Sequence, residues 1–327
     1  MSARTLSRNA PAGASPFALT DAAPLSPGKF ADPHITADGS PRASVALERL
    51  ETLWLNTGTL CNLACAHCYI ESSPTNDALV YLSAEHAAGF LDQLTDAIEI
   101  AFTGGEPFMN PDIMAMLEDA LERGHRVLVL TNAMRPMMRH ADALAALRAR
   151  HGDRLTLRVS VDHYTQGVHE AERGPGSWQA MLDGMQWLSG QGFSIAVAGR
   201  HLAGESDSEA RAGYAELFAA EGISVAAGDP ARLVLFPEMD EGADVPEITE
   251  ACWSILGKNP SDVMCATSRM VVHRKGEDGP RVVACTLLPY DPQFDLGGTL
   301  DQAARPVALN HPHCARFCVL GGASCTA

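Results

Sequence analysis

Short apolar runs alternate with helically spaced apolar residues along most of the chain from residue 53 onward. The apolar runs predict six strands, at 53–57, 98–102, 126–130, 155–161, 193–198 and 233–236. The segments between them predict helices at 83–97, 111–123, 139–150, 177–189 and 208–221. Because continuous apolar strands that alternate with helices are typical of a parallel sheet covered by helices, the pattern predicts an α/β fold.

The two ends of the chain depart from this pattern. Residues 1–45 are rich in Ala, Pro, Ser and Gly without a strand or helix period, so we expect them to be largely disordered, with no room for a folded peptide-recognition domain. After residue 240 the pattern predicts a β-hairpin made of 270–274 and 281–284. We therefore expect a core domain at 46–240 and a small α+β domain at 241–327.

Composition narrows the possible classes of function. The 327 residues are 46% hydrophobic and carry a net charge of −16, which argues against binding to nucleic acid or to an anionic membrane. No apolar run approaches the length of a membrane span, and the N-terminus lacks the apolar segment of a secretory signal. Clustered cysteines in such a chain indicate metal ligands, so we expect a cytoplasmic, oxygen-sensitive protein.

Three cysteines lie close together directly after the first predicted strand. Cys61, Cys65 and Cys68 follow the spacing C-x3-C-x2-C, which offers three thiolates to a four-iron cube and leaves one iron open. A fourth, distant ligand is one alternative, and a structural zinc site completed by His67 is another. The Gly-Gly-Glu-Pro run that begins at Gly104, at the end of the second predicted strand, favours the open iron because a zinc site leaves it unexplained.

These motifs together closely resemble the radical S-adenosylmethionine (radical SAM) superfamily. The resemblance implies a partial (β/α)6 TIM barrel with its ligand site at the carboxyl ends of the strands. It also implies that the open iron of a [4Fe–4S] cluster chelates SAM, which is cleaved to a 5′-deoxyadenosyl radical. A flavodoxin or ferredoxin would supply the electron.

The resemblance also assigns residues to SAM. Tyr69 would lie along the adenine, and the backbone of Gly104 and Gly105 with the Glu106 carboxylate would meet the methionyl ammonium. The remaining candidates lie at the ends of the third, fourth and fifth predicted strands: Asn132 and Ser160 for the ribose or carboxylate of SAM, and Arg200 for its carboxylate. Helix capping is the alternative for the first two of these, and a surface salt bridge for the third.

We expect a polar cluster at the end of the fourth predicted strand to face the place where the substrate binds. It contains Asp162, His163 and Tyr164, and His163 is our candidate proton donor or acceptor. Structural hydrogen bonding is the alternative for this histidine.

Five late cysteines resemble the twitch or SPASM appendage of several radical SAM enzymes: Cys265, Cys285, Cys314, Cys318 and Cys325. Two fully ligated cubes would need eight cysteines, so we expect one auxiliary [4Fe–4S] cluster with one cysteine to spare. A zinc ribbon is the rival interpretation.

The sequence thus predicts a radical SAM enzyme that abstracts hydrogen from a small metabolite or a ribosomal peptide. The auxiliary cluster would accept an electron or bind the substrate. A non-catalytic iron–sulfur redox sensor on the same scaffold is the alternative function, and the intact Gly104-Gly105-Glu106 run argues against it.

Overall fold

One nine-stranded sheet organises the molecule. The computed structural model describes residues 15–17, 22–237 and 240–322. The strands of the sheet lie in the order β10-β9-β8-β2-β3-β4-β5-β6-β7, and β2 to β7 are parallel neighbours in chain order. These six strands are β2 Thr52–Asn56, β3 Glu99–Thr103, β4 Arg126–Thr131, β5 Leu155–Ser160, β6 Ser194–Arg200 and β7 Leu233–Phe236. Each coincides with a predicted strand to within two residues.

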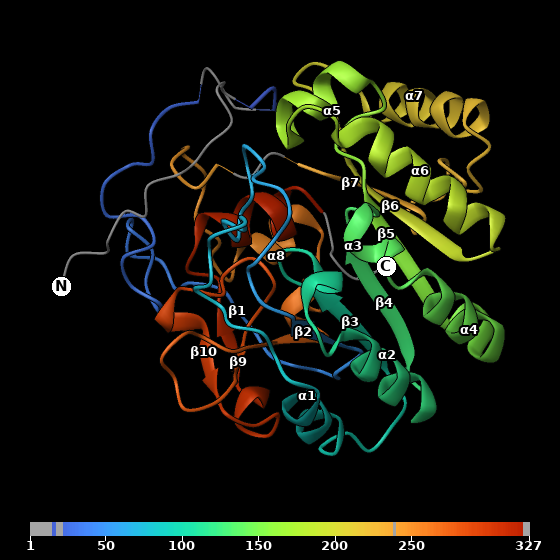
Figure 1. The fold of residues 1–327 in the computed structure, drawn as a ribbon. Helices are drawn as coiled ribbons and strands as arrows, with labels where there is room; N and C mark the ends of the chain where they lie inside the picture. Colours follow the sequence, from blue (N-terminus) through green and yellow to red (C-terminus); the bar gives the residue numbers. More distant parts are fainter. Residues whose placement is uncertain (1–14, 18–21, 238–239, 323–327) are drawn as a thin grey trace.

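Helices connect the parallel strands and lie on one side of the sheet in Figure 1. They are α1 Ala84–Leu91, α2 Ile113–Glu122, α3 Arg135–Met138, α4 Ala141–His151, α5 Gln166–Arg173, α6 Ser177–Gly190 and α7 Asp207–Ala220. A further helix, α8 Cys252–Leu256, follows β7 and does not belong to this group. The Ser83 hydroxyl accepts a hydrogen bond from the His86 N–H and so caps the start of α1. Helix α1 ends earlier than predicted, and α3 and α5 were not predicted.

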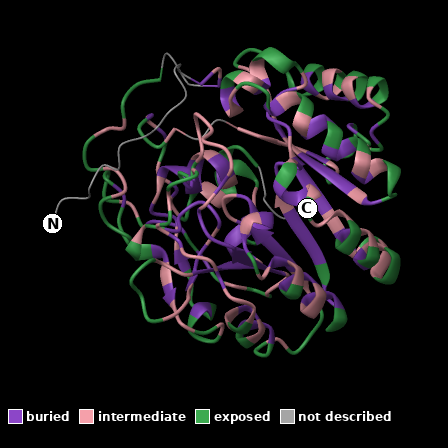
Figure 2. Ribbon diagram, in the orientation of Figure 1, coloured by how far each residue is buried: buried purple, intermediate pink, exposed green. Residues whose placement is uncertain are grey.

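The parallel strands form the core because both of their faces are covered. All five residues of β2 are buried, and Trp54 is among the largest fully buried side chains. Figure 2 shows buried strands beneath helices whose outer faces are exposed. This distribution agrees with the continuous apolar runs from which the parallel sheet was predicted.

The C-terminal strands extend the same sheet. The predicted hairpin is present as β8 Ser268–Val272 and β9 Arg281–Val283, which pair antiparallel, and β10 Asp295–Gly297 follows at the edge. Strand β8 also pairs in parallel with β2, so the sheet continues from 46–240 into 241–327. A π-helix, Cys314–Leu320, ends the described part of the chain.

The segment before β2 is packed against the C-terminal part. Strand β1, Ser44–Val45, pairs with β11, Val307–Ala308, and the buried Arg42 guanidinium lies 2.5 Å from a carboxylate oxygen of Glu247. These contacts differ from the disorder expected for residues 1–45, because the apolar and charged partners of this segment are more than 200 residues away in the sequence. No helix in the described part of the chain is long and apolar enough to cross a membrane.

Candidate active site

The three clustered cysteines open onto one cavity at the carboxyl ends of the parallel strands. This main cavity has a volume of about 1140 Å³, counted to its open mouth, which is large enough for a small-molecule ligand. Its lining includes most of the predicted site residues: Cys61, Cys65, Cys68, Tyr69, Gly104, Gly105, Asn132, Ser160 and Arg200. Two predicted residues, Glu106 and His163, do not line it.

Cys61 is buried, Cys65 and Cys68 are half-buried, and backbone amides donate to two of the three thiols. Burial raises the pKa of Cys61 and of Cys65 to about 12, and it also raises the pKa of Cys68. The N–H of Leu63 donates to Cys61 Sγ at 3.4 Å, and the N–H of Ser72 donates to Cys68 Sγ at 3.3 Å. Such donors favour the thiolate, which is the form that binds iron, so metal binding here would release protons.

The described residues contain no group of three or more His, Cys, Asp or Glu side chains that would hold a single metal ion. A four-iron cube binds each cysteine through a different iron, so its ligands stand farther apart than those of one ion.

Gly104 and Gly105 allow β3 to approach the start of the cysteine loop. The N–H of Gly105 donates to the Gly58 carbonyl at 2.8 Å. A Cβ at Gly105 would lie 2.3 Å from the Leu60 carbonyl oxygen, and Gly104 has a φ of +139°. The missing side chains therefore make room for backbone as well as for a ligand, which the sequence interpretation did not anticipate.

Glu106 lies behind the wall of the main cavity. Its carboxylate accepts hydrogen bonds from the N–H of Asn132 at 2.8 Å and from the Thr131 hydroxyl at 2.9 Å. A third bond comes from the N–H of Phe108. Burial raises the pKa of Glu106 to about 7, although these hydrogen bonds act in the opposite direction. The geometry makes Glu106 a positioning residue that joins the ends of β3 and β4.

Helix α5 holds the cysteine loop from the side. The fully buried Glu172 accepts a hydrogen bond from the N–H of His67 at 2.8 Å, and its own carbonyl accepts one from the N–H of Ala66. Sequence reasoning missed this helix because its buried positions include His169 and Glu172 rather than an apolar stripe. In the sequence, Arg173 directly before Gly174 is a pattern typical of the end of a helix, and it could have indicated α5.

A charge network surrounds the Cys65 side of the main cavity. The Arg173 Nε donates to a carboxylate oxygen of Asp162, and the Arg200 Nε lies 3.5 Å from the other oxygen. Burial by itself would raise the pKa of Asp162, but the charges of Arg173 and Arg200 hold it below its usual range. Arg173 also acts on Cys65, whose pKa it lowers against the larger effect of burial.

Arg200 lines the main cavity and also contacts the cysteine loop and α5. Its Nη2 donates to the His67 carbonyl at 3.2 Å, and its Nη1 lies 3.8 Å from Glu172 Oε1. The ring of Phe17, from the N-terminal segment, packs 5.1 Å from its guanidinium carbon. Arg200 therefore supports the cysteine loop from inside the cavity wall.

His163 is held away from the main cavity. Its Nδ1 lies 2.9 Å from the Thr165 hydroxyl, and its ring stacks on Tyr164 with centroids 4.1 Å apart. Its Nε2 lies 3.8 Å from Glu205 Oε2. These contacts fit the structural alternative for this histidine better than proton transfer to a ligand.

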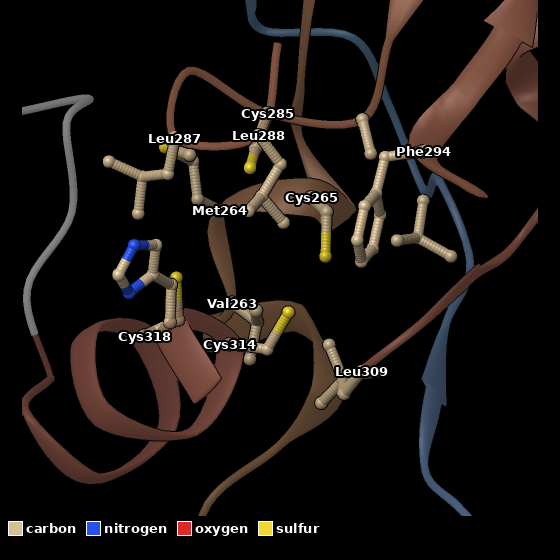
Figure 3. A pocket seen from close by; sticks show the side chains of 13 residues that line it. Val263, Met264, Cys265, Cys285, Leu287, Leu288, Phe294, Leu309, Cys314 and Cys318 are labelled. Carbon is tan, nitrogen blue, oxygen red and sulfur yellow. The ribbon is translucent and has the colours of Figure 1, made fainter. Parts of the chain in front are cut away.

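Four of the late cysteines share a second cavity of about 370 Å³, the C-terminal cavity (Figure 3). It is lined by Cys265, Cys285, Cys314 and Cys318, with mainly apolar residues between them. Figure 3 shows Cys314 and Cys318 on the π-helix facing Cys265, which lies in the short 3-10 helix Met264–Ala266, and Cys285, which lies in a loop. Cys325, the fifth predicted ligand, lies outside the described residues. Leu287 lines both cavities, so they are neighbours.

A buried cation lies beside this second set of thiols. Arg269 is 1% exposed, and its guanidinium donates to the carbonyls of Cys265, at 2.6 Å, and Ala303, at 2.8 Å. Burial lowers the pKa of Arg269, and negative charge on Cys265 and Cys285 acts against that shift. A guanidinium in this position favours thiolates over thiols, so the site fits an anionic, cysteine-ligated group.

Comparison with known proteins identifies the domain that contains the main cavity. Residues 55–213 match the family model described as the radical SAM superfamily. The chain is 34% identical over 141 residues to the antilisterial bacteriocin subtilosin biosynthesis protein AlbA of Bacillus subtilis, covering 42% of this chain and 30% of that protein. It is 30% identical over 153 residues to the mycofactocin maturase MftC of Mycobacterium ulcerans, covering 45% of this chain and 40% of the relative.

Two solved structures share the fold. Streptococcus suis SuiB bound to S-adenosylmethionine superposes with a TM-score of 0.55 at 14% identity, over 76% of this chain and 63% of SuiB. The structure of anSMEcpe with bound AdoMet gives 0.53 at 14%, over 77% of this chain and 76% of that one. The prediction of a radical SAM superfamily domain is confirmed, and the names of the relatives as maturases support an enzyme. The chain spans well under half the length of the two curated relatives.

Proposed function

We propose that this chain, with its radical SAM domain at residues 55–213, is an enzyme that cleaves S-adenosylmethionine reductively and removes hydrogen from an organic substrate. One observation carries the proposal. The three cysteines of a single loop open onto the same cavity as Gly104 and Gly105, at the carboxyl ends of parallel strands. Ligand sites of parallel α/β folds lie at this end of the sheet.

The residues fit the groups that this chemistry needs. Three thiols with amide donors to two of them suit a [4Fe–4S] cluster whose fourth iron is left for SAM. When bound, the cluster and SAM would supply a 5′-deoxyadenosyl radical that abstracts hydrogen. Tyr69, which is 42% exposed at the cavity, offers a ring face for the adenine. Asn132 and Ser160 offer polar groups for the ribose.

Other residues hold this arrangement in place without contacting SAM. Glu106 fixes the Thr131–Asn132 corner, and Glu172 fixes the loop between Cys65 and Cys68. Arg173 and Arg200 balance the charge of Asp162 beside the thiols. We assign these residues to positioning, which replaces the direct contacts to SAM expected for Glu106 and Arg200.

We further propose one auxiliary [4Fe–4S] cluster in the C-terminal cavity. Its four ligands would be Cys265, Cys285, Cys314 and Cys318, because a cubane takes four cysteines and these four line one cavity. Cys325 is then the spare cysteine. Since Leu287 lines both cavities, the auxiliary cluster would sit near the bound substrate and serve as its electron acceptor.

The relatives favour a peptide over a small metabolite as the substrate. The bacteriocin and mycofactocin proteins are named for biosynthesis and maturation, and SuiB has been solved bound to the precursor peptide SuiA. We therefore propose a ribosomal peptide as substrate, with a small metabolite as the alternative, and a flavodoxin or ferredoxin as electron donor.

Release of 5′-deoxyadenosine tests the proposed reaction. Anaerobically reconstituted protein should hold about eight irons and form 5′-deoxyadenosine from SAM with dithionite. Cys65→Ala should abolish this product, whereas Cys252→Ala, outside both cavities, should not. Protein with full iron that forms no 5′-deoxyadenosine would favour the redox sensor instead. Cys285→Ala should still release 5′-deoxyadenosine but hold about four irons.

A further inference from the structure

A histidine lines the C-terminal cavity together with its four cysteines. His313 directly precedes the π-helix that carries Cys314 and Cys318 and is 5% exposed. Its ring Nδ1 is buried and has no hydrogen-bond partner among the described residues. The other lining residues in view are apolar, among them Leu287 and Leu288 (Figure 3).

A buried ring nitrogen without a partner is costly. Such a group loses its hydrogen bonds to water without gaining others, so buried polar atoms in native proteins are almost always bonded. The neighbouring His311 differs, because its Nδ1 accepts a hydrogen bond from the backbone N–H of His313 at 3.1 Å and it does not line the cavity. The partner of His313 Nδ1 is therefore to be sought in whatever occupies the cavity.

We propose that His313 donates an Nδ1–H hydrogen bond to a sulfur of the auxiliary cluster held by Cys265, Cys285, Cys314 and Cys318. This inference rests on the auxiliary cluster of the proposed function. A neutral imidazole carries one ring N–H, and the four thiolates already saturate a cubane, so the histidine acts as donor and not as ligand. Hydrogen bonds to cluster sulfurs stabilise the reduced, more negative state and raise the reduction potential.

The consequence for function is that the cluster becomes a better electron acceptor. The buried Arg269 guanidinium beside Cys265 and Cys285 acts in the same direction, because it also favours added negative charge. His313 and Arg269 therefore both favour the reduced state of the auxiliary cluster, His313 by a hydrogen bond and Arg269 by its charge.

The test uses full-length protein in which Cys61, Cys65 and Cys68 are all replaced by Ala, so that only the auxiliary cluster remains. Reconstituted protein should hold about four irons. In this background His313→Leu should keep its iron but lower the one-electron reduction equilibrium constant about tenfold, which is about 59 mV. His313→Gln, which retains an N–H donor, should recover part of the shift, and His311→Gln should leave the potential unchanged.

A second readout reports the hydrogen bond itself. Electron–nuclear double resonance of the reduced cluster should detect a proton that exchanges in D2O, and His313→Leu should remove it. Unchanged potential and proton coupling in His313→Leu, with iron retained, would overturn the proposal. Loss of iron from a His313→Leu protein that circular dichroism shows to be folded would make the histidine a ligand and also overturn it. Absence of iron from the background variant would overturn the auxiliary cluster as well, while the main-cavity chemistry would stand.

Discussion

Glu172 and His67 are joined by a 2.8 Å hydrogen bond from the backbone N–H of His67 to the Glu172 carboxylate. The bond links the last turn of α5 to the middle of the cysteine loop. The other carboxylate oxygen accepts the Ser15 hydroxyl at 2.6 Å, so the N-terminal segment meets the loop through the same side chain. A fully buried carboxylate thus connects three distant parts of the chain next to the proposed cluster.

Glu172→Ala should loosen the cysteine loop. Hydrogen bonds to a charged group contribute about 1.5–3 kcal/mol each, and the change also removes a negative charge near Arg200. We expect the variant to lose most of the main-cavity iron while it keeps the auxiliary iron. Iron analysis and SAM titration check this, with Gln166→Ala, on the exposed start of the same helix, as control. Normal iron content and SAM affinity in Glu172→Ala would show that the loop holds its own shape.

The sequence was sufficient to predict the parallel sheet and the three-cysteine loop, because both depend on local patterns. Apolar runs mark the buried strands, and Cys61, Cys65 and Cys68 lie within eight residues of one another. Helix α5 escaped prediction because its buried side chains are polar and find their partners only in the folded chain. Its role at the site follows from contacts more than 100 residues apart in sequence, such as that between His67 and Glu172.

The C-terminal region also shows that local sequence patterns do not predict contacts between residues far apart in the chain. The hairpin of β8 and β9 was predicted from its local pattern, but the parallel pairing of β8 with β2 joins residues more than 200 positions apart. The packing of residues 22–45 was missed for the same reason, since a polar, Pro-rich segment gives no local sign of distant partners such as Glu247. The convergence of four late cysteines on one cavity required the structure.

Gly105→Ala should disrupt the site through backbone contact. The added Cβ would lie 2.3 Å from the Leu60 carbonyl oxygen, and Cβ atoms do not approach backbone so closely, so the start of the cysteine loop must shift. We expect SAM cleavage to fall at least 100-fold, which corresponds to about 2.7 kcal/mol in the barrier. Gly89→Ala, in α1 with open space around its Cβ, is the matched control and should be neutral or slightly stabilising. Equal rates of 5′-deoxyadenosine release for the two variants would contradict the role of this close approach.

Glu106→Gln should change how stability depends on pH. Burial raises the pKa of Glu106 from 4.5 to about 7 in the folded protein, so the folded state holds its proton more tightly than the unfolded state. This contribution to stability is fully present below pH 4.5 and is lost as the pH rises through about 7. At 1.36 kcal/mol per pKa unit, the loss across this window is about 3 kcal/mol.

Denaturant unfolding of the apoprotein between pH 4 and pH 8 measures how the free energy of unfolding depends on pH. Wild type should lose stability relative to Glu106→Gln as the pH rises, because the glutamine cannot ionise. Glu118→Gln, a partly exposed position on α2, serves as control and should follow wild type. Parallel curves for wild type and Glu106→Gln would mean that the carboxylate keeps an ordinary pKa behind the cavity wall.

Arg269→Met should weaken the hold on the auxiliary cluster. The buried guanidinium lies beside Cys265 and lowers the pKa of that thiol, so its removal raises the pKa of Cys265 and favours protonation over metal binding. We expect a chelator to remove the auxiliary iron several-fold faster from this variant, while the main-cavity iron is lost at the wild-type rate. Arg269→Lys keeps the charge but not the fork that contacts several carbonyls, so it should give an intermediate rate. Arg281→Met, which removes a half-exposed cation paired with Asp295, controls for a general loss of positive charge in the hairpin. If all three variants lose iron at the wild-type rate, Arg269 serves only to bind the loop carbonyls together, and the charge of the auxiliary site is balanced elsewhere.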